Sequence, residues 1–172
     1  MYRTLPYIAL FAATMLLQVF LFDNLSISVY LNPLIYMAFI VLLPLDTPPV
    51  VLLGAGLLTG VAMDAAMGTA GINTIATLPV AFARPMLLNL LCGRDSIREG
   101  GVPSSERLGR RKFIDYMVIV ILLHHTLFFL LEALSWEHLL HTVIRIVVSS
   151  LVTLAFVWII ARVFTVKLSV RV

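Results

Sequence analysis

Long apolar runs separated by short polar segments fill most of this chain and restrict its fold more than any other feature. Apolar residues make up 61% of the 172 residues and charged residues 12%, whereas a soluble domain is about 45–50% apolar and about 25% charged. A fold in water could not bury so much apolar surface, so the sequence predicts an all-α integral membrane protein. The length allows one membrane domain and no sizeable soluble domain. The single cysteine, Cys92, excludes an internal disulfide.

Six apolar segments fit a polytopic chain with six transmembrane helices. The first is predicted to be a retained helix, because its apolar run is longer than the core of a usual signal peptide. The second is the weakest, because it is short and Asn32-Pro33 opens it, so a five-span chain without it is the alternative. The predicted spans are about 5–22, 31–45, 48–66, 71–92, 113–134 and 139–165.

The positive charges predict the orientation of these spans. Six of the 12 Lys and Arg residues fall in the loop 93–112, and others lie near the two ends of the chain. With six spans all of these charges share one side, which the positive-inside rule places in the cytoplasm. A five-span chain would separate Arg3 from the basic loop. The charge distribution therefore favours six spans with both termini in the cytoplasm.

The basic loop 93–112 also contains glycine, proline and serine, so it is expected to be mobile. Its charges are expected to anchor the topology and to touch the anionic lipid bilayer, and docking of a cytoplasmic partner is the alternative. Nucleic-acid binding is not expected, because no stacking aromatic residues accompany the charges.

The stretch 54–73 combines small residues with one carboxylate, Asp64. Small residues at every fourth position form one helix face that another helix can approach closely, and a carboxylate near membrane depth needs polar partners. The topology places Asp64 near the outer end of its span, where it could accept hydrogen bonds from the start of the next helix at 71–74. Contact with a partner or substrate is the alternative. The predicted helix-packing or partner-binding residues are Gly56, Gly60, Asp64, Gly68 and Gly71.

Arg84 is a cation inside the fourth predicted span, followed directly by Pro85. It lies about 12 Å from the cytoplasmic end of that span at 1.5 Å per residue. An antiparallel pairing of spans three and four would place it near Gly54 and Gly56. It is expected to satisfy a carbonyl freed by the proline or, alternatively, to pair with Asp115.

Polar side chains also recur along the last two predicted spans. His124 and Glu132 share one helix face, and His141 and Arg145 share a face of the next helix. An antiparallel hairpin would set Glu132 beside His141 and His124 beside Ser149, with Arg145 a turn from either. Hydrogen bonds between the helices and an ion pair are the favoured interpretation. Proton-linked chemistry and metal binding are the alternatives.

No enzymatic motif accompanies these residues. The chain has no compact H-E-x-x-H set, no Gly-x-Ser-x-Gly and no phosphate loop. We therefore expect no enzymatic activity and no cofactor, with metal binding by the histidines and Glu132 kept as an alternative.

The stretch 60–73, with the sequence GVAMDAAMGTAGIN, resembles the G-x-x-x-D-x-x-x-G-x-x-x-G-like region of the MreD family of bacterial rod shape-determining membrane proteins. The length and the six-span hydropathy are also similar. Asp64 matches the acidic position of the family, and Arg84 lies where many relatives have a basic residue. The loop 93–112 is longer than that of a minimal member.

This resemblance implies a subunit of the cell-elongation machinery in the bacterial inner membrane. Such a subunit binds the single-span scaffold MreC, and through it joins MreB filaments to the peptidoglycan synthase RodA and its class B penicillin-binding protein. The resemblance also implies a fold similar to the substrate-binding components of energy-coupling-factor transporters. The alternative function is a substrate-binding subunit of a vitamin-type transporter, with a polar pocket formed by His124, Glu132, His141 and Arg145.

Overall fold

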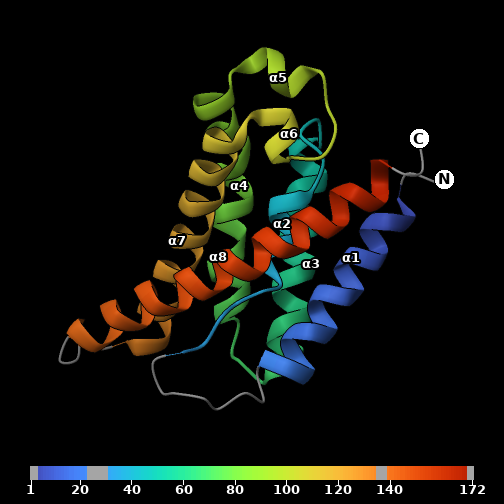
Figure 1. Ribbon diagram of the computed structural model, residues 1–172. Helices are drawn as coiled ribbons and strands as arrows, with labels where there is room; N and C mark the ends of the chain where they lie inside the picture. Colours follow the sequence, from blue (N-terminus) through green and yellow to red (C-terminus); the bar gives the residue numbers. More distant parts are fainter. Residues whose placement is uncertain (1–3, 23–30, 135–138, 170–172) are drawn as a thin grey trace.

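The computed structural model describes residues 4–22, 31–134 and 139–169, with side chains described as far as residue 166. All regular secondary structure in these ranges is helical (Figure 1). The elements are α1 (Leu5–Leu16), the π-helical turn η1 (Leu17–Phe22), α2 (Met37–Leu42), α3 (Pro49–Met67), α4 (Ile72–Cys92), α5 (Arg94–Arg98), α6 (Ser105–Leu108), α7 (Arg110–Ala133) and α8 (Leu139–Ser169).

Five of these helical stretches are long and apolar enough to cross a membrane, which is the pattern of a multi-pass membrane protein. They agree with five of the six predicted spans to within about three residues at most boundaries. The five stretches are Leu5–Phe22, Pro49–Met67, Ile72–Cys92, Arg110–Ala133 and Leu139–Val166.

The hairpin of α3 and α4 has ends that the local sequence dictates. Pro49 opens α3, where its missing N–H would have no partner in any case. Gly68 ends α3 with a φ of 68°, and Gly71 precedes α4 with a φ of 89°. Glycine adopts this left-handed conformation without the strain that a Cβ would cause, so the chain reverses within a few residues.

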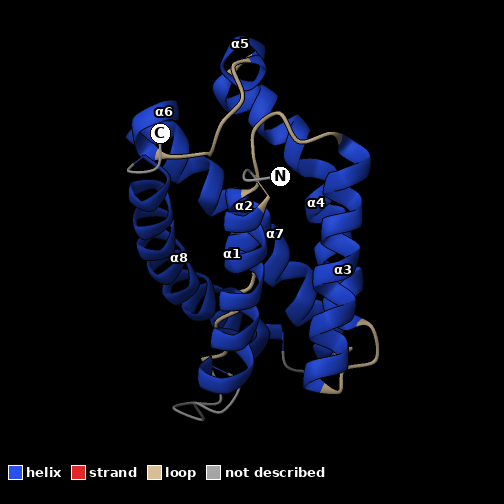
Figure 2. Cartoon of the chain, turned by 90° about the vertical axis from the view of Figure 1, so that its right-hand side faces the viewer, coloured by secondary structure: helices blue, strands red, loops and turns tan. Residues whose placement is uncertain are grey.

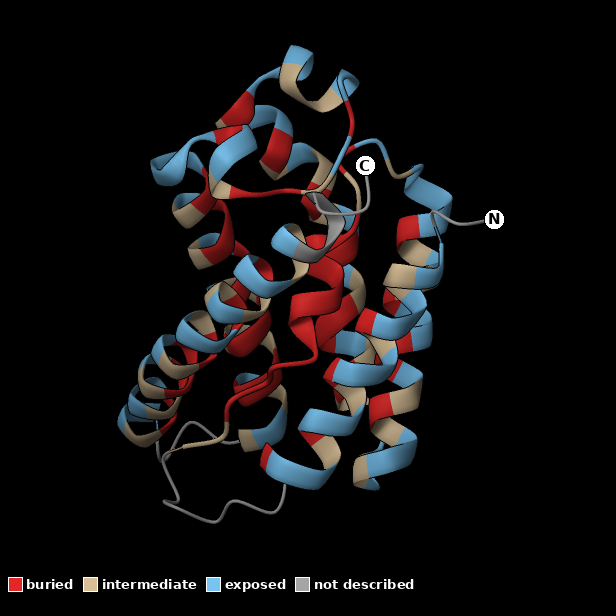
Figure 3. Cartoon of the chain, turned by 45° about the vertical axis from the view of Figure 1, so that its right-hand side comes forward, coloured by how far each residue is buried: buried red, intermediate tan, exposed pale blue. Residues whose placement is uncertain are grey.

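The predicted second span, 31–45, is wrong as a membrane helix. Only the six residues of α2 are α-helical there, and six residues rise about 9 Å, far less than the ~30 Å of the hydrocarbon core. Every residue from 34 to 43 is at most 8% exposed. Figure 3 shows this buried stretch in the centre of the molecule, enclosed by the long helices.

The irregular part of this segment has its backbone groups satisfied by side chains. A buried N–H or C=O without a partner costs free energy, and in a membrane no water replaces the partner. The side chains come from η1 and α8. The bonds run from Asn32 N to Ser149 Oγ (3.0 Å), Leu34 N to Thr153 Oγ1 (3.1 Å), Ile35 N to Gln18 Oε1 (2.6 Å) and Gln18 Nε2 to Pro33 O (3.1 Å).

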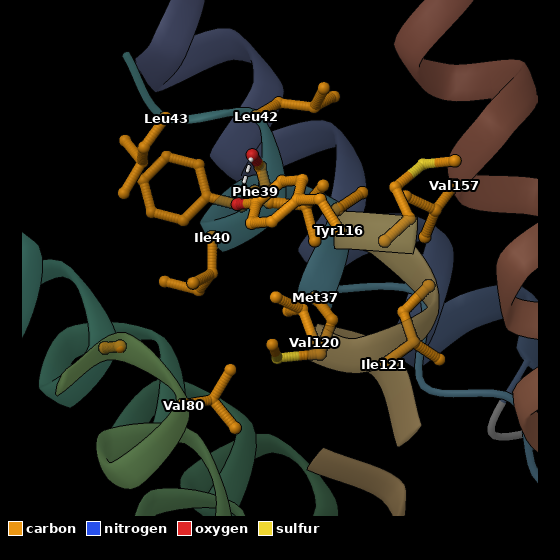
Figure 4. Close-up of a cluster of buried hydrophobic side chains, with 14 of the residues drawn as sticks. Met37, Phe39, Ile40, Leu42, Leu43, Val80, Tyr116, Val120, Ile121 and Val157 are labelled. Carbon is orange, nitrogen blue, oxygen red and sulfur yellow. Dashed lines mark hydrogen bonds between the residues drawn. The ribbon is translucent and has the colours of Figure 1, made fainter. Parts of the chain in front are cut away.

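Apolar side chains of α2 form the centre of the hydrophobic core. They pack against residues of α4, α7 and α8 (Figure 4). The labelled members of this cluster include Met37, Ile40, Val80, Val120, Ile121 and Val157. A short helix that is buried all round, rather than on one face, is the arrangement expected for an apolar segment with no polar side.

The basic loop, for which mobility was expected from its composition, contains regular structure. It forms the short helices α5 and α6, which gather at one end of the bundle (Figure 2). Ser104 caps α6 by accepting a hydrogen bond from Arg107 N (3.2 Å). The N–H of Leu45 donates to the carbonyl of Gly101 (2.8 Å), so this loop covers the end of the segment 31–45.

Candidate functional site

Asp64 lies in the last turn of α3 and accepts hydrogen bonds from the turn that follows and from the start of α4. Its Oδ1 accepts from Asn73 N (2.9 Å), Asn73 Nδ2 (3.1 Å) and Thr69 Oγ1 (2.5 Å). Its Oδ2 accepts from Thr74 N (2.9 Å) and Thr74 Oγ1 (2.5 Å). The expected role as an acceptor for the next helix start is confirmed. A carboxylate has about four lone-pair sites, so these donors leave none for a further ligand.

A chain of hydrogen bonds leads from Asp64 to the buried His124. Because the NH₂ group of Asn73 faces Asp64, its Oδ1 faces the hydroxyl of Tyr36, which donates to it (2.9 Å). The Tyr36 oxygen lies 3.0 Å from Nε2 of His124. Since the Tyr36 proton is already used, Nε2 of His124 must carry the hydrogen and donate it. The hydrogen bonds that begin at Asp64 on α3 thereby fix the tautomer of His124, a fully buried residue of α7.

The other nitrogen of His124, Nδ1, is buried and has no hydrogen-bond partner in the described part of the chain. Nε2 also lies 3.2 Å from Oγ1 of Thr77. The ring is 0% exposed, so the chain ends inside the protein. An amide in its middle donates and accepts without passing a proton on, and the chain therefore orients side chains rather than conducting protons.

His125, for which the sequence suggested no role, connects α7 to the broken segment. Its Nδ1 lies 2.9 Å from the carbonyl of Ile121 and therefore carries the hydrogen. Its Nε2 then accepts from the hydroxyl of Thr153 (3.0 Å), and the same hydroxyl oxygen accepts from the backbone N–H of Leu34 (3.1 Å). Two adjacent histidines thus hold different tautomers and bind different elements.

Arg84 is 1% exposed and donates to the carboxyl-terminal end of α2. Its Nε donates to Tyr116 Oη (2.8 Å), its Nη1 to Pro44 O (3.3 Å), and its Nη2 to Leu43 O and to Val41 O (3.5 Å from the latter). The hydroxyl of Tyr116 donates to Val41 O (3.0 Å), the dashed line in Figure 4. The guanidinium therefore satisfies carbonyls that the short helix leaves without partners.

The predicted surroundings of Arg84 are wrong in two respects. The space opposite Gly56 is occupied by Ala81 and Thr77 rather than by the guanidinium. Asp115 is exposed and does not pair with it. The true acceptors could not be predicted, since they lie about 40 residues away in a segment whose sequence does not indicate irregular structure.

The glycines of α3 allow α4 to approach closely. A Cβ at Gly56 would lie 2.7 Å from the Cβ of Ala81, and one at Gly60 would lie 2.5 Å from the Cα of Thr74. Real Cβ atoms do not come so near, so α4 fills this face. Gly56 and Gly60 were predicted to serve either helix packing or partner binding, and this geometry favours helix packing. A partner helix would have to displace α4 to contact them.

Of the four residues proposed for a polar pocket, two form an ion pair and His124 lies apart from that pair. Glu132 and Arg145 form an ion pair (2.9 Å), and the guanidinium lies 4.7 Å from the ring centroid of Phe129. His124 lies two turns away from Glu132 along α7 and bonds to Tyr36. His141 is half-buried on α8. Two surface depressions, around Trp158 and around Arg111, lie elsewhere and include none of the four.

The register of α7 against α8 differs from the expected one by about one helical turn. His125 faces Thr153 and Glu132 faces Arg145, whereas the expected register placed Glu132 beside His141. The intervening residues 135–138, on which the expected register was centred, lie outside the described residues.

No group of three or more His, Cys, Asp or Glu side chains in the described ranges is placed to hold a metal ion. The polar side chains instead bind backbone groups and one another. These side chains supply hydrogen-bond partners to an irregular segment that is buried over residues 34–43.

Comparison of the chain with family models, curated proteins and solved structures finds no match. The functional conclusion therefore rests on the residues themselves and on their geometry.

Proposed function

We propose that the chain is a non-enzymatic subunit of the bacterial cell-elongation complex, in the inner (cytoplasmic) membrane. In this role it binds an MreC-type scaffold and helps to couple MreB filaments to peptidoglycan synthesis by RodA and a class B penicillin-binding protein. The observation that carries the proposal is the MreD-like stretch 60–73. Gly60 packs against α4, Asp64 caps it, and Gly68 and Gly71 turn the chain. The stretch that resembles the family is thus a structural unit, in keeping with an assembly subunit.

The proposal includes six membrane crossings with both termini in the cytoplasm. The segment 31–45 supplies the sixth crossing although most of it is not helical. If its residues outside helix and turn are extended at about 3.3 Å each and the others rise about 1.5 Å, it reaches at most about 35 Å, enough for the hydrocarbon core. The start of α1, the end of α8 and the basic helices α5 and α6 lie in the same half of the molecule (Figure 1), as the positive-inside rule requires. A fold similar to energy-coupling-factor substrate-binding components belongs to the same proposal.

Surfaces other than the α3 seam and Asp64 are left for the scaffold. The seam is filled by α4, and the carboxylate of Asp64 has all its acceptor sites occupied. The partner would therefore bind the finished hairpin from outside, and substitutions inside the hairpin would affect binding through folding.

Depletion of the chain in its native host tests the proposal, which expects that host to be a rod-shaped bacterium. We expect cells to widen and become round as the protein is lost, and wild-type protein expressed in trans to restore rods. Unchanged cell width after verified depletion would contradict the proposed function.

The alternative, a substrate-binding subunit of a vitamin-type transporter, is favoured by one observation. Broken membrane segments with unwound backbone commonly form binding sites in transporters, and 31–45 is such a segment. A ligand that binds the folded state raises its apparent stability. Thermal unfolding of the purified protein with a panel of vitamins would reveal such a ligand, whereas an assembly subunit is stabilised by its protein partner alone.

A further inference from the structure

The carboxyl-terminal end of α2 gathers three backbone carbonyls around one point. They belong to Val41, Leu43 and Pro44, and all three accept hydrogen bonds from Arg84. The carbonyl end of a helix carries partial negative charge, and unwound carbonyls at broken membrane helices coordinate free cations in transporters. The end of α2 therefore has the composition of a cation site.

The cation in this site is part of the chain. Arg84 reaches it from α4 and is 1% exposed, and no acidic side chain lies within ion-pair distance of it among the residues that the structure describes. Tyr116 closes the remaining side, accepting from Nε of Arg84 (2.8 Å) and donating to Val41 O (3.0 Å). In the described structure the hydrogen-bond acceptors of the guanidinium are thus all neutral oxygen atoms.

The arrangement matches a guanidinium better than a spherical ion. A guanidinium presents its donors in a planar fork, whereas an ammonium or a metal ion is a point charge. Here the donors of three different nitrogens each meet a separate oxygen. We propose that the end of α2 is a guanidinium-selective carbonyl site in which Arg84 is the tethered ligand, and that this ligand holds the segment 31–45 in its broken conformation without any exchangeable ion.

The test removes the Arg84 side chain and adds free guanidinium to the solution. Arg84→Ala, purified in mild detergent, is expected to unfold roughly 5 °C or more below the wild type, because buried acceptors lose their donors. Low-millimolar guanidinium or methylguanidinium chloride, far below denaturing concentrations, should raise the midpoint of the variant in a saturable manner. Sodium chloride at the same concentration should not, and the wild type should gain nothing from either salt.

A matched control separates site filling from general stabilisation. Leu88→Ala removes a buried side chain one turn further along α4 (Leu88 is 1% exposed) and should be destabilised without rescue by guanidinium. Equal rescue of both variants, or no rescue of a folded Arg84→Ala protein, would overturn the proposal.

Two further readouts cover the case in which Arg84→Ala does not fold. Purification in methylguanidinium should then recover a monodisperse protein, and failure to recover it counts against the site. Arg84→Lys keeps the positive charge but lacks the planar donor arrangement of the guanidinium, so this variant should be less stable than the wild type. A lysine variant of wild-type stability would contradict selectivity for guanidinium.

Discussion

Individual polar residues in this protein act by fixing the orientation of their neighbours. Asp64 sets the amide of Asn73, the amide sets the hydroxyl of Tyr36, and the hydroxyl sets the tautomer of His124. Buried polar networks of this kind are stabilising only when each member is satisfied. Substitution of a residue in this hydrogen-bond network should therefore lower the unfolding free energy by more than one lost contact would.

Asp64→Asn tests the first link. An amide can accept at only one of its two ends, so some of the donors at the start of α4 lose their acceptor, and we expect a loss of about 1–3 kcal/mol in unfolding free energy. Asp115→Asn, at an exposed carboxylate of α7, serves as the control and should change stability little. Thermal or denaturant unfolding in detergent measures both. Equal effects of the two variants would show that the hydrogen bonds of Asp64 contribute nothing specific.

Tyr36→Phe tests whether the hydrogen bonds from Asp64 to His124 form one coupled network. It leaves Asn73 and His124 without their shared partner. Combined with Asp64→Asn, its effect should deviate from additivity by about 0.5–3 kcal/mol, because both changes act on Asn73. A double-mutant cycle on unfolding free energy provides the measurement. Strict additivity would show that the hydrogen bonds of Asp64 and those of Tyr36 are not coupled.

At the scale of the helices, the α3–α4 hairpin and the broken segment contribute in different ways. The hairpin is local and its packing depends on small residues. The segment 31–45 depends on side chains that lie up to 119 residues away in the chain. The hairpin should therefore tolerate changes elsewhere better than the segment does.

A pair of glycine substitutions tests the packing of the hairpin. Gly60→Ala introduces a Cβ 2.5 Å from the backbone of Thr74 and should cost about 1–3 kcal/mol by overpacking. Gly54→Ala, on the same helix with nothing within 4 Å, should be neutral or gain up to about 1 kcal/mol in helix propensity. Unfolding of the isolated protein is the measurement. If Gly60→Ala leaves the isolated protein unchanged but abolishes partner binding, the seam is a docking face after all.

Hydropathy was sufficient to predict the five long helices, because each is a continuous apolar run of sufficient length. It could not predict the form of 31–45, since an apolar run of this length is compatible with a helix, a strand or an irregular buried segment. What decides between them is the supply of partners for its backbone. Those partners, Gln18, Arg84 and Thr153, lie in other helices and give no local signal.

The same distinction divides the candidate site. The role of Asp64 was predictable because its partners follow within ten residues. The acceptors of Arg84 and the partners of His124 were not, because they depend on how distant elements meet. The pairing of Glu132 was missed by one helical turn, since a hairpin register depends on the geometry of its turn as well as on the spacing of polar residues.

The molecule as a whole presents apolar side chains outward on its long helices, including Phe82 and Met86 on α4, which are 75% and 72% exposed. In a membrane, lipid tails cover such a surface at no cost. α8 is longer than a bilayer requires, with 28 residues in its apolar stretch, which a helix accommodates by tilting. The proposed membrane crossings can be tested directly.

Cysteine labelling in spheroplasts tests the proposed topology. In a Cys92→Ser background, Ala70→Cys should react with a membrane-impermeant maleimide, because the turn after α3 faces outward in the proposed topology. Thr4→Cys and Glu106→Cys should react only after permeabilisation, since the proposed topology puts both on the cytoplasmic side. Thr4 and Glu106 on opposite sides would show that the segment 31–45 does not cross the membrane.

The identity of the proteins that bind this chain tests the central claim most directly. The tagged wild-type protein would be purified from native membranes in mild detergent, beside an unrelated tagged multi-pass protein, and its partners quantified by mass spectrometry. The account predicts selective enrichment of an MreC-type scaffold together with RodA and a class B penicillin-binding protein. Enrichment of transporter ATPase subunits without the scaffold would contradict it.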